Sequence, residues 1–455
     1  MCTVLSHGTH IKSLIMKYLY TILLAGILLA GATRSFSQEI NARVLTMREA
    51  FELAAKNSTQ LKVSEINTDL VHQEVAIARL GKLPEVSTGL NYGYLSNSQA
   101  WDPSFGKHAT APLPHNLTQF SLQASEVIFK GGEIANNLKK ATLEEQIAVL
   151  GQEKSLEDIK FLVAAKYLDI YRLINQRQVY LDNIKLSQER LKNILSLQKQ
   201  GLVTNNDVLR TKLIISDLQL AVRRTDDNIK IQNQQLNIVL GLDLNERLMP
   251  DSSILTNLPK EENIDRLMSV AFENNKDLKT AGKEIEAAQI NLKLTGADRY
   301  PKVSLFTANN LQRPYIYSTP ARDIYYNNWM AGVSISYNIS SIYQSPQKIK
   351  AGKIQVEQSL AKETVQKQNV EVAVQADLIK FNEARYELDT YTSDLQSAEE
   401  NFRIVEKKYF NQLALLQDLI DATNTKIEAE LKISNARINL VYNHYQLEKS
   451  IGLLQ

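Results

Sequence analysis

The sequence predicts a mainly α-helical protein with a transmembrane β part, arranged as two tandem repeats of helix, strand, strand, long helix and helix. Three observations lead to this prediction: few turn-forming residues, an internal duplication, and stretches of alternating polarity between long helical stretches. Glycine occurs 17 times and proline 10 times in 455 residues, which is about half the share usual in globular proteins. Turns must therefore be few and elements long, which argues against a β-sandwich.

The duplication sets the predicted domain organisation. Five positions of the first half recur 217 residues later without a gap, namely Asn57, Leu61, Pro84, Val86 and Ser87, which match Asn274, Leu278, Pro301, Val303 and Ser304. Towards the ends of the two halves the offset is 211, where Asp207 matches Asp418. Such an ordered series with a nearly constant offset predicts one repeat at residues 38–250 and a second at 251–455.

The N-terminal 37 residues have the pattern of a secretory signal peptide. Lys17 precedes an apolar run over residues 18–32, and Ser35 to Ser37 form a small-residue cleavage site. We therefore expect Met16 to be the true initiator, the extra residues before it being a misplaced start. A transmembrane anchor is the alternative, but an apolar run of about 15 residues is shorter than the ~20 that span a bilayer.

The first repeat begins with helical spacing over residues 46–83, with Thr46 as a capping residue and Pro84 as the end. Residues 86–95 and 120–125 then alternate between apolar and small or polar side chains, which is typical of strands. The intervening segment, residues 96–116, is expected to be an external loop, as is its counterpart at 312–325.

The second repeat has the sharpest alternation of the chain, from Trp329 to Ile339. Tyrosines and a tryptophan gather near the ends of these strands, which suits a membrane barrel with aromatic girdles. A soluble sheet packed on one face explains the strands equally well. The long helices favour the first interpretation, because few globular domains need them.

Two stretches, residues 131–200 and 345–411, are nearly free of glycine and proline, so each can form one helix of ~100 Å at 1.5 Å per residue. Both carry apolar residues in steps of three and four, as a left-handed coiled coil requires. The predicted seams are Leu156, Ile159, Val163, Tyr167, Ile170 and Ile174 in the first stretch, and Phe381, Ala384, Leu388, Tyr391, Leu395, Ala398, Phe402, Val405 and Tyr409 in the second.

Several function classes lack support in the sequence. Lys and Arg number 52 against 50 Asp and Glu, so the chain has no basic excess for binding nucleic acid. None of the 6 histidines belongs to a metal-binding motif. We therefore predict no enzymatic activity, no cofactor and no metal site.

Taken together, these features resemble the TolC family of outer-membrane efflux channels over residues 45–452. The resemblance rests on Leu83-Pro84 before the first strand, Gly201-Leu202-Val203 with Asp207 in the first hairpin, and the run Asp418 to Thr423 in the second. It implies a homotrimer in the lipid of the bacterial outer membrane, whose four strands per chain close a 12-stranded β-barrel. An α-helical coiled-coil barrel would continue it through the periplasm.

The resemblance also implies a function and its residues. The chain would be the passive exit duct of a tripartite efflux or type I secretion system, working with a periplasmic adaptor and an inner-membrane pump. Asp418 and Asp421 match the periplasmic gate, and Tyr409 with Asp207 matches a contact that closes the hairpins. The adaptor would dock at Gly201, Leu202 and Val203.

One departure and one alternative accompany this interpretation. Ala414 stands where the resemblance places an arginine, which removes one ionic link from the closed tip. The alternative function is a soluble periplasmic coiled-coil scaffold whose strands form a small cap. The sequence leaves the transported cargo unspecified, whether small molecules or proteins.

Overall fold

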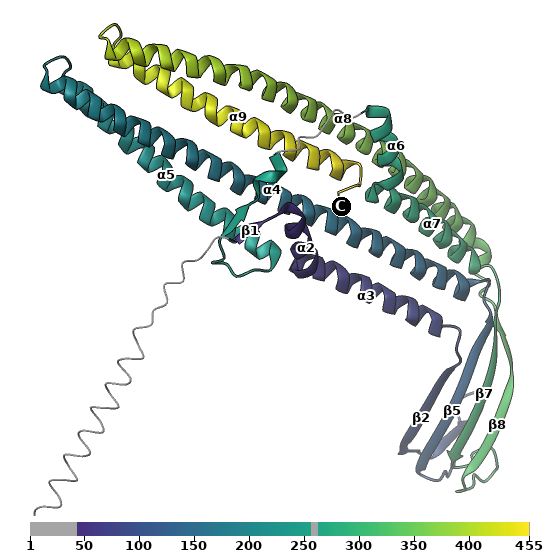
Figure 1. The fold of residues 1–455 in the computed structure, drawn as a ribbon. Helices are drawn as coiled ribbons and strands as arrows, with labels where there is room; N and C mark the ends of the chain where they lie inside the picture. Colours follow the sequence, from purple (N-terminus) through teal and green to yellow (C-terminus); the bar gives the residue numbers. More distant parts are fainter. Residues whose placement is uncertain (1–42, 256–262, 455) are drawn as a thin grey trace, which may run out of the picture.

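The computed structural model describes residues 43–255 and 263–454. The predicted signal peptide at residues 1–37, with Met16 as initiator, lies outside the described residues. An elongated body of helices carries a β-sheet at one end and two helical hairpins at the other (Figure 1).

The order helix, helix, strand, strand, long helix, helix occurs twice, and the first half has additional short strands and a short 3₁₀ helix. The first half contains β1 (Arg43–Leu45), α2 (Met47–Asn57), α3 (Thr59–Leu80), β2 (Glu85–Tyr94), β3 (Ser98–Trp101), β4 (His108–Ala111), β5 (Asn116–Phe129), α4 (Glu133–Lys199), α5 (Asn205–Leu240), β6 (Leu248–Pro250) and the short 3₁₀ helix η1 (Ser252–Leu255). The second half contains α6 (Ile264–Asn274), α7 (Lys276–Ala297), β7 (Lys302–Arg313), β8 (Tyr326–Ser336), α8 (Ser341–Phe410) and α9 (Leu416–Ser450).

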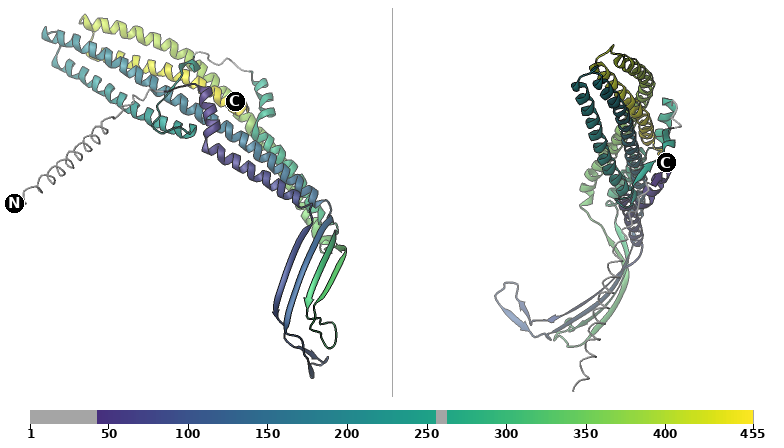
Figure 2. Two further views of the ribbon diagram at one scale, coloured as in Figure 1. Left: turned by 60° about the horizontal axis from the view of Figure 1, so that its bottom comes forward. Right: turned by 60° about the vertical axis from the view of Figure 1, so that its left-hand side comes forward.

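The main sheet is antiparallel and has four strands in the order β2, β5, β7, β8. It is strongly curved (Figure 2). Within the described residues, β2 pairs only with β5 and β8 pairs only with β7, so each has one open edge. Residues 96–116, predicted to be a loop, instead contain the small hairpin of β3 and β4.

The helices extend the order of the strands. Next to the sheet, α3 packs on α4, α4 on α7, and α7 on α8. Towards the hairpin end, α5 packs on α4, α4 on α9, and α9 on α8. The outermost helices are thus α3 and α8 in one half of the body, and α5 and α8 in the other. Within the described residues, no helix combines the length and apolar character needed to cross a bilayer.

Both predicted coiled-coil seams are confirmed. Every residue of the two series is buried or partly buried. In α8, most of the residues that lie between successive seam positions are exposed. The first seam leads into the main core, where Tyr167 is fully buried. The Tyr167 hydroxyl donates to the Leu45 carbonyl oxygen at 2.7 Å and accepts from the Asp251 amide at 2.7 Å. Burial raises the pKa of this hydroxyl, so it stays protonated and joins α4 to the end of β1 and to the residue that follows β6.

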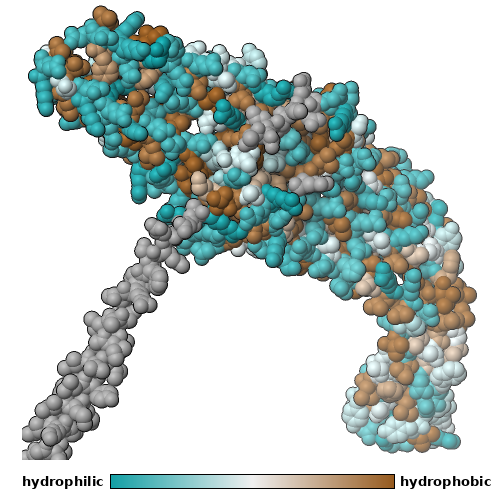
Figure 3. Space-filling model, viewed as in Figure 1, coloured by the Kyte–Doolittle hydropathy of each residue, from teal (hydrophilic) through white to brown (hydrophobic). Residues whose placement is uncertain are grey.

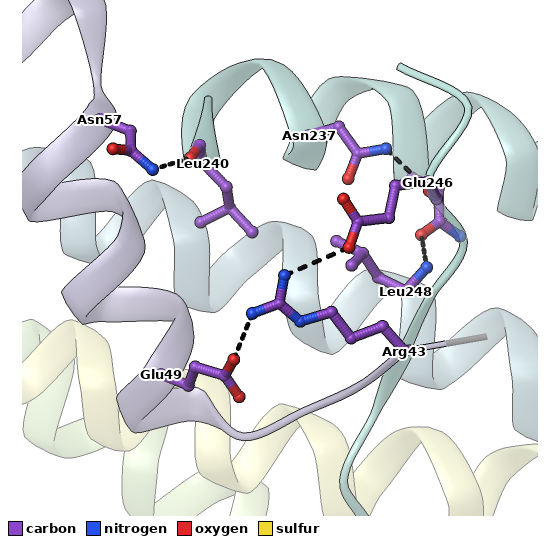
Figure 4. A network of polar contacts seen from close by, with 8 residues as sticks. Arg43, Glu49, Asn57, Asn237, Leu240, Glu246 and Leu248 are labelled. Atoms are coloured by element: carbon purple, nitrogen blue, oxygen red, sulfur yellow. Dashed lines mark hydrogen bonds and ion pairs between the residues drawn. The ribbon is translucent and has the colours of Figure 1, made fainter. Parts of the chain in front are cut away.

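The prediction of one helix over residues 46–83 was wrong, because the helix breaks at Ser58. Thr46 does cap α2, accepting from the Glu49 amide, but Ser58 adopts an extended conformation and caps a new helix, α3. The break brings Asn57 against the end of α5, where its amide nitrogen donates to the Leu240 carbonyl at 3.0 Å. Figure 4 shows this contact beside Arg43, which pairs with both Glu49 and Glu246.

Gly241 makes this close approach possible. It has a φ of +66°, and a Cβ atom there would lie 2.6 Å from the Asn57 Cβ. The second repeat uses the same device, since Gly452 has a φ of +74° and lies against Asn274. Glycine is required at both positions for two reasons, the left-handed backbone and the missing side chain.

Gly241→Ala is therefore expected to destabilise the chain by about 1–3 kcal/mol, because it combines a strained backbone with a steric clash. The matched control is Gly151→Ala in α4, where a Cβ meets open space. This change should stabilise the chain, raising its free energy of unfolding by about 0.5–1 kcal/mol. Thermal unfolding of the detergent-solubilised variants, followed by circular dichroism, tests this. Equal midpoints for the two variants would contradict the packing argument.

Candidate functional site at the helical tips

The two hairpin turns at the end of the helical body have the same backbone geometry. In the first, Gly201 has a φ of +74°, and in the second, Gln412 has a φ of +63°. Each helix ends with the same pair of hydrogen bonds, which is the pattern of a Schellman cap. In the first turn the amides of Leu202 and Gly201 donate to the carbonyls of Leu197 and Gln198, and in the second the amides of Leu413 and Gln412 donate to the carbonyls of Lys408 and Tyr409. The second turn thus holds a non-glycine residue in the left-handed region, where the backbone is strained.

Asp207 and Asp418 occupy equivalent places at the starts of α5 and α9. The Asp207 carboxylate accepts from the backbone and hydroxyl of Thr204, at 3.0 and 3.1 Å. Among the described residues, the Asp418 carboxylate accepts from the Leu415 amide alone, at 2.9 Å. Both acids are therefore helix caps, and their negative charge is stabilised by the positive end of the helix dipole.

Asp421 lies one turn further along α9, on the same exposed side as Asp418. Its carboxylate accepts from the Gln417 amide nitrogen at 2.9 Å. The Gln417 oxygen in turn accepts from Arg210 of α5 at 2.9 Å. The chain Arg210, Gln417, Asp421 is thus a polar link between the two hairpins.

Beneath the turns, the four helices share a small apolar core. It consists of Ile194, Val208, Phe402, Tyr409, Leu416 and Leu419. Ala414, which stands where the resemblance places an arginine, packs against this core. Leu202 and Leu413, next to the two turn residues, point outward and are exposed.

The structure places Tyr409 within this core and close to Asp207. Burial and the nearby Asp207 carboxylate raise the pKa of the Tyr409 hydroxyl. That hydroxyl is buried and has no hydrogen-bond partner among the described residues, since Asp207 is engaged with Thr204. The two residues are thus neighbours without a direct bond in this conformation.

Sequence reasoning missed Arg190 of α4, which joins three helices beside Tyr409. Its side chain is 3% exposed. One guanidinium nitrogen donates to the Thr423 hydroxyl of α9 at 3.1 Å, and another lies 3.6 Å from the Glu406 carboxylate of α8. The group also lies 5.5 Å from the centre of the Phe402 ring. The spacing in the sequence could have indicated its burial, because Asn183, Ser187, Arg190 and Ile194 are separated by the steps of three and four of a coiled-coil seam. All four are buried in the structure.

Within residues 43–255 and 263–454, no group of three or more His, Cys, Asp or Glu side chains could hold a metal ion. The tips instead combine exposed acids, an inter-hairpin polar link and a buried arginine.

The family model described as outer membrane efflux protein matches residues 50–242 and 267–453. This chain belongs to that family. Outer membrane protein TolC of Escherichia coli strain K12 is 21% identical over 462 residues, covering 96% of this chain and 87% of that protein. The resemblance to the TolC family is therefore confirmed.

Solved outer-membrane channels share the fold. VceC of Vibrio cholerae has a TM-score of 0.73 at 13% identity, covering 89% of this chain and 96% of that one. CmeC of Campylobacter jejuni has a TM-score of 0.73 at 14% identity, covering 90% and 86%. The open state of MtrE of Neisseria gonorrhoeae has a TM-score of 0.71 at 15% identity, covering 90% and 89%.

Membership of the family confirms the predicted function and location. The chain is an outer-membrane efflux duct, and it acts in transport across the outer membrane. The alternative, a soluble periplasmic scaffold, is not favoured. The family consists of transport channels rather than enzymes.

Proposed function

We propose that three copies of the chain associate into one duct, with a 12-stranded β-barrel in the outer membrane and a barrel of helices in the periplasm. The observation that carries this proposal is the pair of open strand edges on β2 and β8. Four strands are too few to close a barrel, since single-chain barrels begin at about eight. Pairing of β8 with β2 of the next copy satisfies both edges.

The outermost helices support the same association. Both α3 and α8 carry a series of exposed apolar residues. The two series are Val63, Ile66, Leu70, Ile77 and Leu80 on α3, and Val365, Val372, Ile379 and Tyr386 on α8. Both follow heptad spacing, and such seams bury themselves against another helix. In the proposed trimer, the edge helices α3 and α5 of one copy pack on α8 of the next.

The two faces of the sheet match a lipid outside and a water-filled lumen inside. One face carries rows of mainly apolar residues across paired strands, such as Val86, Ala124, Thr307 and Ala331. The other carries mainly small and polar residues, such as Gly89, Ser121, Asn310 and Asn328. Figure 3 shows apolar residues over the strands near their junction with the helices. This alternation is that of outer-membrane barrels.

At the opposite end, three copies of Asp418 and of Asp421 would surround one axis. Carboxylates gathered in this way repel anions and attract cations, an effect that salt screens. We propose that this ring is the periplasmic gate, closed by the contacts between hairpins that include Tyr409 and Asp207. The duct itself is passive, and an inner-membrane pump supplies energy and selects the cargo.

The adaptor would dock at the exposed first turn, Gly201, Leu202 and Val203. The second turn has Gln412 where the first has Gly201. Docking is therefore expected to differ between the two hairpins, and the first turn is the stronger site.

Leu70→Glu is expected to prevent assembly, because it places three charges within the apolar seams between copies. Ala76→Glu adds the same charge to an exposed position on another face of α3 and should leave the assembly intact. Native mass spectrometry in detergent distinguishes trimers from single chains. Trimers of equal abundance for both variants would refute the assignment of the seam.

Replacement of both gate acids, Asp418→Asn and Asp421→Asn, removes charge but keeps hydrogen-bond acceptors at the start of α9. We expect the cation preference of the channel in planar bilayers to fall severalfold. Asp217→Asn is the matched control, because it removes an exposed acid of α5 that lies away from the turns. If the control lowers cation preference as much as the double variant, the second hairpin does not form the gate.

Gly201→Glu is expected to block adaptor binding while trimers still form. The left-handed backbone at this position strains any other residue, so Gly201→Asn is the control, since asparagine tolerates that conformation best. Pull-down of the partner adaptor by the two variants tests the role of the turn. Undiminished capture by Gly201→Glu would remove the first turn from the docking site.

A further inference from the structure

The tip half of the α4 seam differs in chemistry from the half near the main core. Near the core, the seam is apolar apart from Tyr167, whose hydroxyl has partners on both sides. At the tip, three of the four buried positions of α4 are polar, namely Asn183, Ser187 and Arg190, and the fourth is Ile194. Since an apolar series would pack better there, the polar residues require a separate explanation.

These polar groups are incompletely satisfied. The Asn183 Oδ1, the Ser187 Oγ and two Arg190 nitrogens are buried without a hydrogen-bond partner in the described part of the chain, as is the Tyr409 hydroxyl. Arg190 donates one hydrogen bond, to Thr423, and its single carboxylate neighbour, Glu406, is 3.6 Å away. A buried donor without an acceptor costs free energy relative to water, and a buried charge costs more.

The location of Arg190 gives this cost a functional meaning. It extends from the α4–α5 hairpin into the α8–α9 hairpin, where its neighbours are Phe402, Glu406 and Thr423. In this structure the two hairpins are packed together, an arrangement that we refer to as the closed tip. Their separation would expose the guanidinium to water and hydrate its unpartnered nitrogens. The free energy lost on closing would then be recovered on opening.

We propose that Arg190 is a gating residue that favours opening, because the closed tip holds its charged group buried and incompletely paired. This inference rests on the proposed function, in which the hairpins separate to open the gate. Removal of Arg190 should therefore favour the closed tip, whereas removal of a simple latch would open it. Burial lowers the pKa of Arg190 despite the neighbouring Glu406, which agrees with a net cost for the charge in the closed tip.

Two substitutions should act in opposite directions. Arg190→Met keeps a long side chain in the seam and removes the buried charge, so the closed tip gains stability. Glu406 is then left alone, but it is 28% exposed and water reaches it. Glu406→Gln keeps the shape but removes the carboxylate that pairs with the arginine among the described residues, so the closed tip loses stability.

The test is the open fraction of single channels in planar bilayers at a fixed voltage. We expect Arg190→Met to lower the open fraction about tenfold, which corresponds to about 1.4 kcal/mol. Glu406→Gln should raise it, and the double variant should resemble Arg190→Met. Lys192→Met is the matched control, since Lys192 lies on the exposed side of α4 and its loss should have no effect.

The outcomes separate the inference from the proposed function. A higher open fraction for Arg190→Met would make Arg190 a latch, and an unchanged one would make it purely structural. Either result overturns the inference and leaves the duct intact. If Arg190→Met fails to assemble, the direction of the Glu406→Gln effect decides. Trimers of the unaltered chain that never conduct would overturn both the proposed duct and this inference.

Discussion

The open edges of the single chain are the constraint on which the rest of the structure depends. The strands β2 and β8 each leave one side unpaired within the described residues, and the edge helices α3 and α8 expose apolar residues in heptad spacing. The edge strand β2 and the edge helix α3 lie at one side of the chain, and β8 and α8 lie at the other. One association between copies can therefore bury the open edges of both the sheet and the helices. The low glycine and proline content follows from this plan, because elements that run along an elongated body need few turns.

The seams along α4 divide the body into a fixed part and an adaptable part. Around Tyr167 the core is apolar, and its one buried hydroxyl is fully paired. Towards the tip the same helix buries Asn183, Ser187 and Arg190, several of whose polar atoms lack partners. Well-satisfied packing holds one conformation, whereas buried polar groups that water could reach after a small movement favour a second one. The distribution of side chains thus suits a rigid middle and a tip that opens.

Periodic features were predictable from the sequence, and features set by distant contacts were not. The seam from Phe381 to Tyr409 and the strand alternation depend only on local spacing, and the structure confirms the buried seam. The break at Ser58 was missed because it depends on Gly241, which is far away in the sequence. Arg190 was missed because a polar residue in a seam resembles a solvated one until the neighbouring helices are in place. The gate and docking residues came from resemblance and remain proposals.

Divergence of the two repeats explains why one hairpin would carry the charge of the gate. At an offset of 211, Asp418 corresponds to Asp207, and Asp421 corresponds to Arg210. These two equivalent positions therefore carry no net charge in α5, where they are Asp207 and Arg210. In α9, where they are Asp418 and Asp421, they carry two negative charges. Thr204 holds Asp207 through its backbone and its hydroxyl, whereas Leu415 offers Asp418 only a backbone amide. The acids of α9 are thus both more numerous and less occupied by local bonds. The two hairpins thus share the helix cap, whereas the pair of acids that the proposed gate requires is present at these positions only in α9.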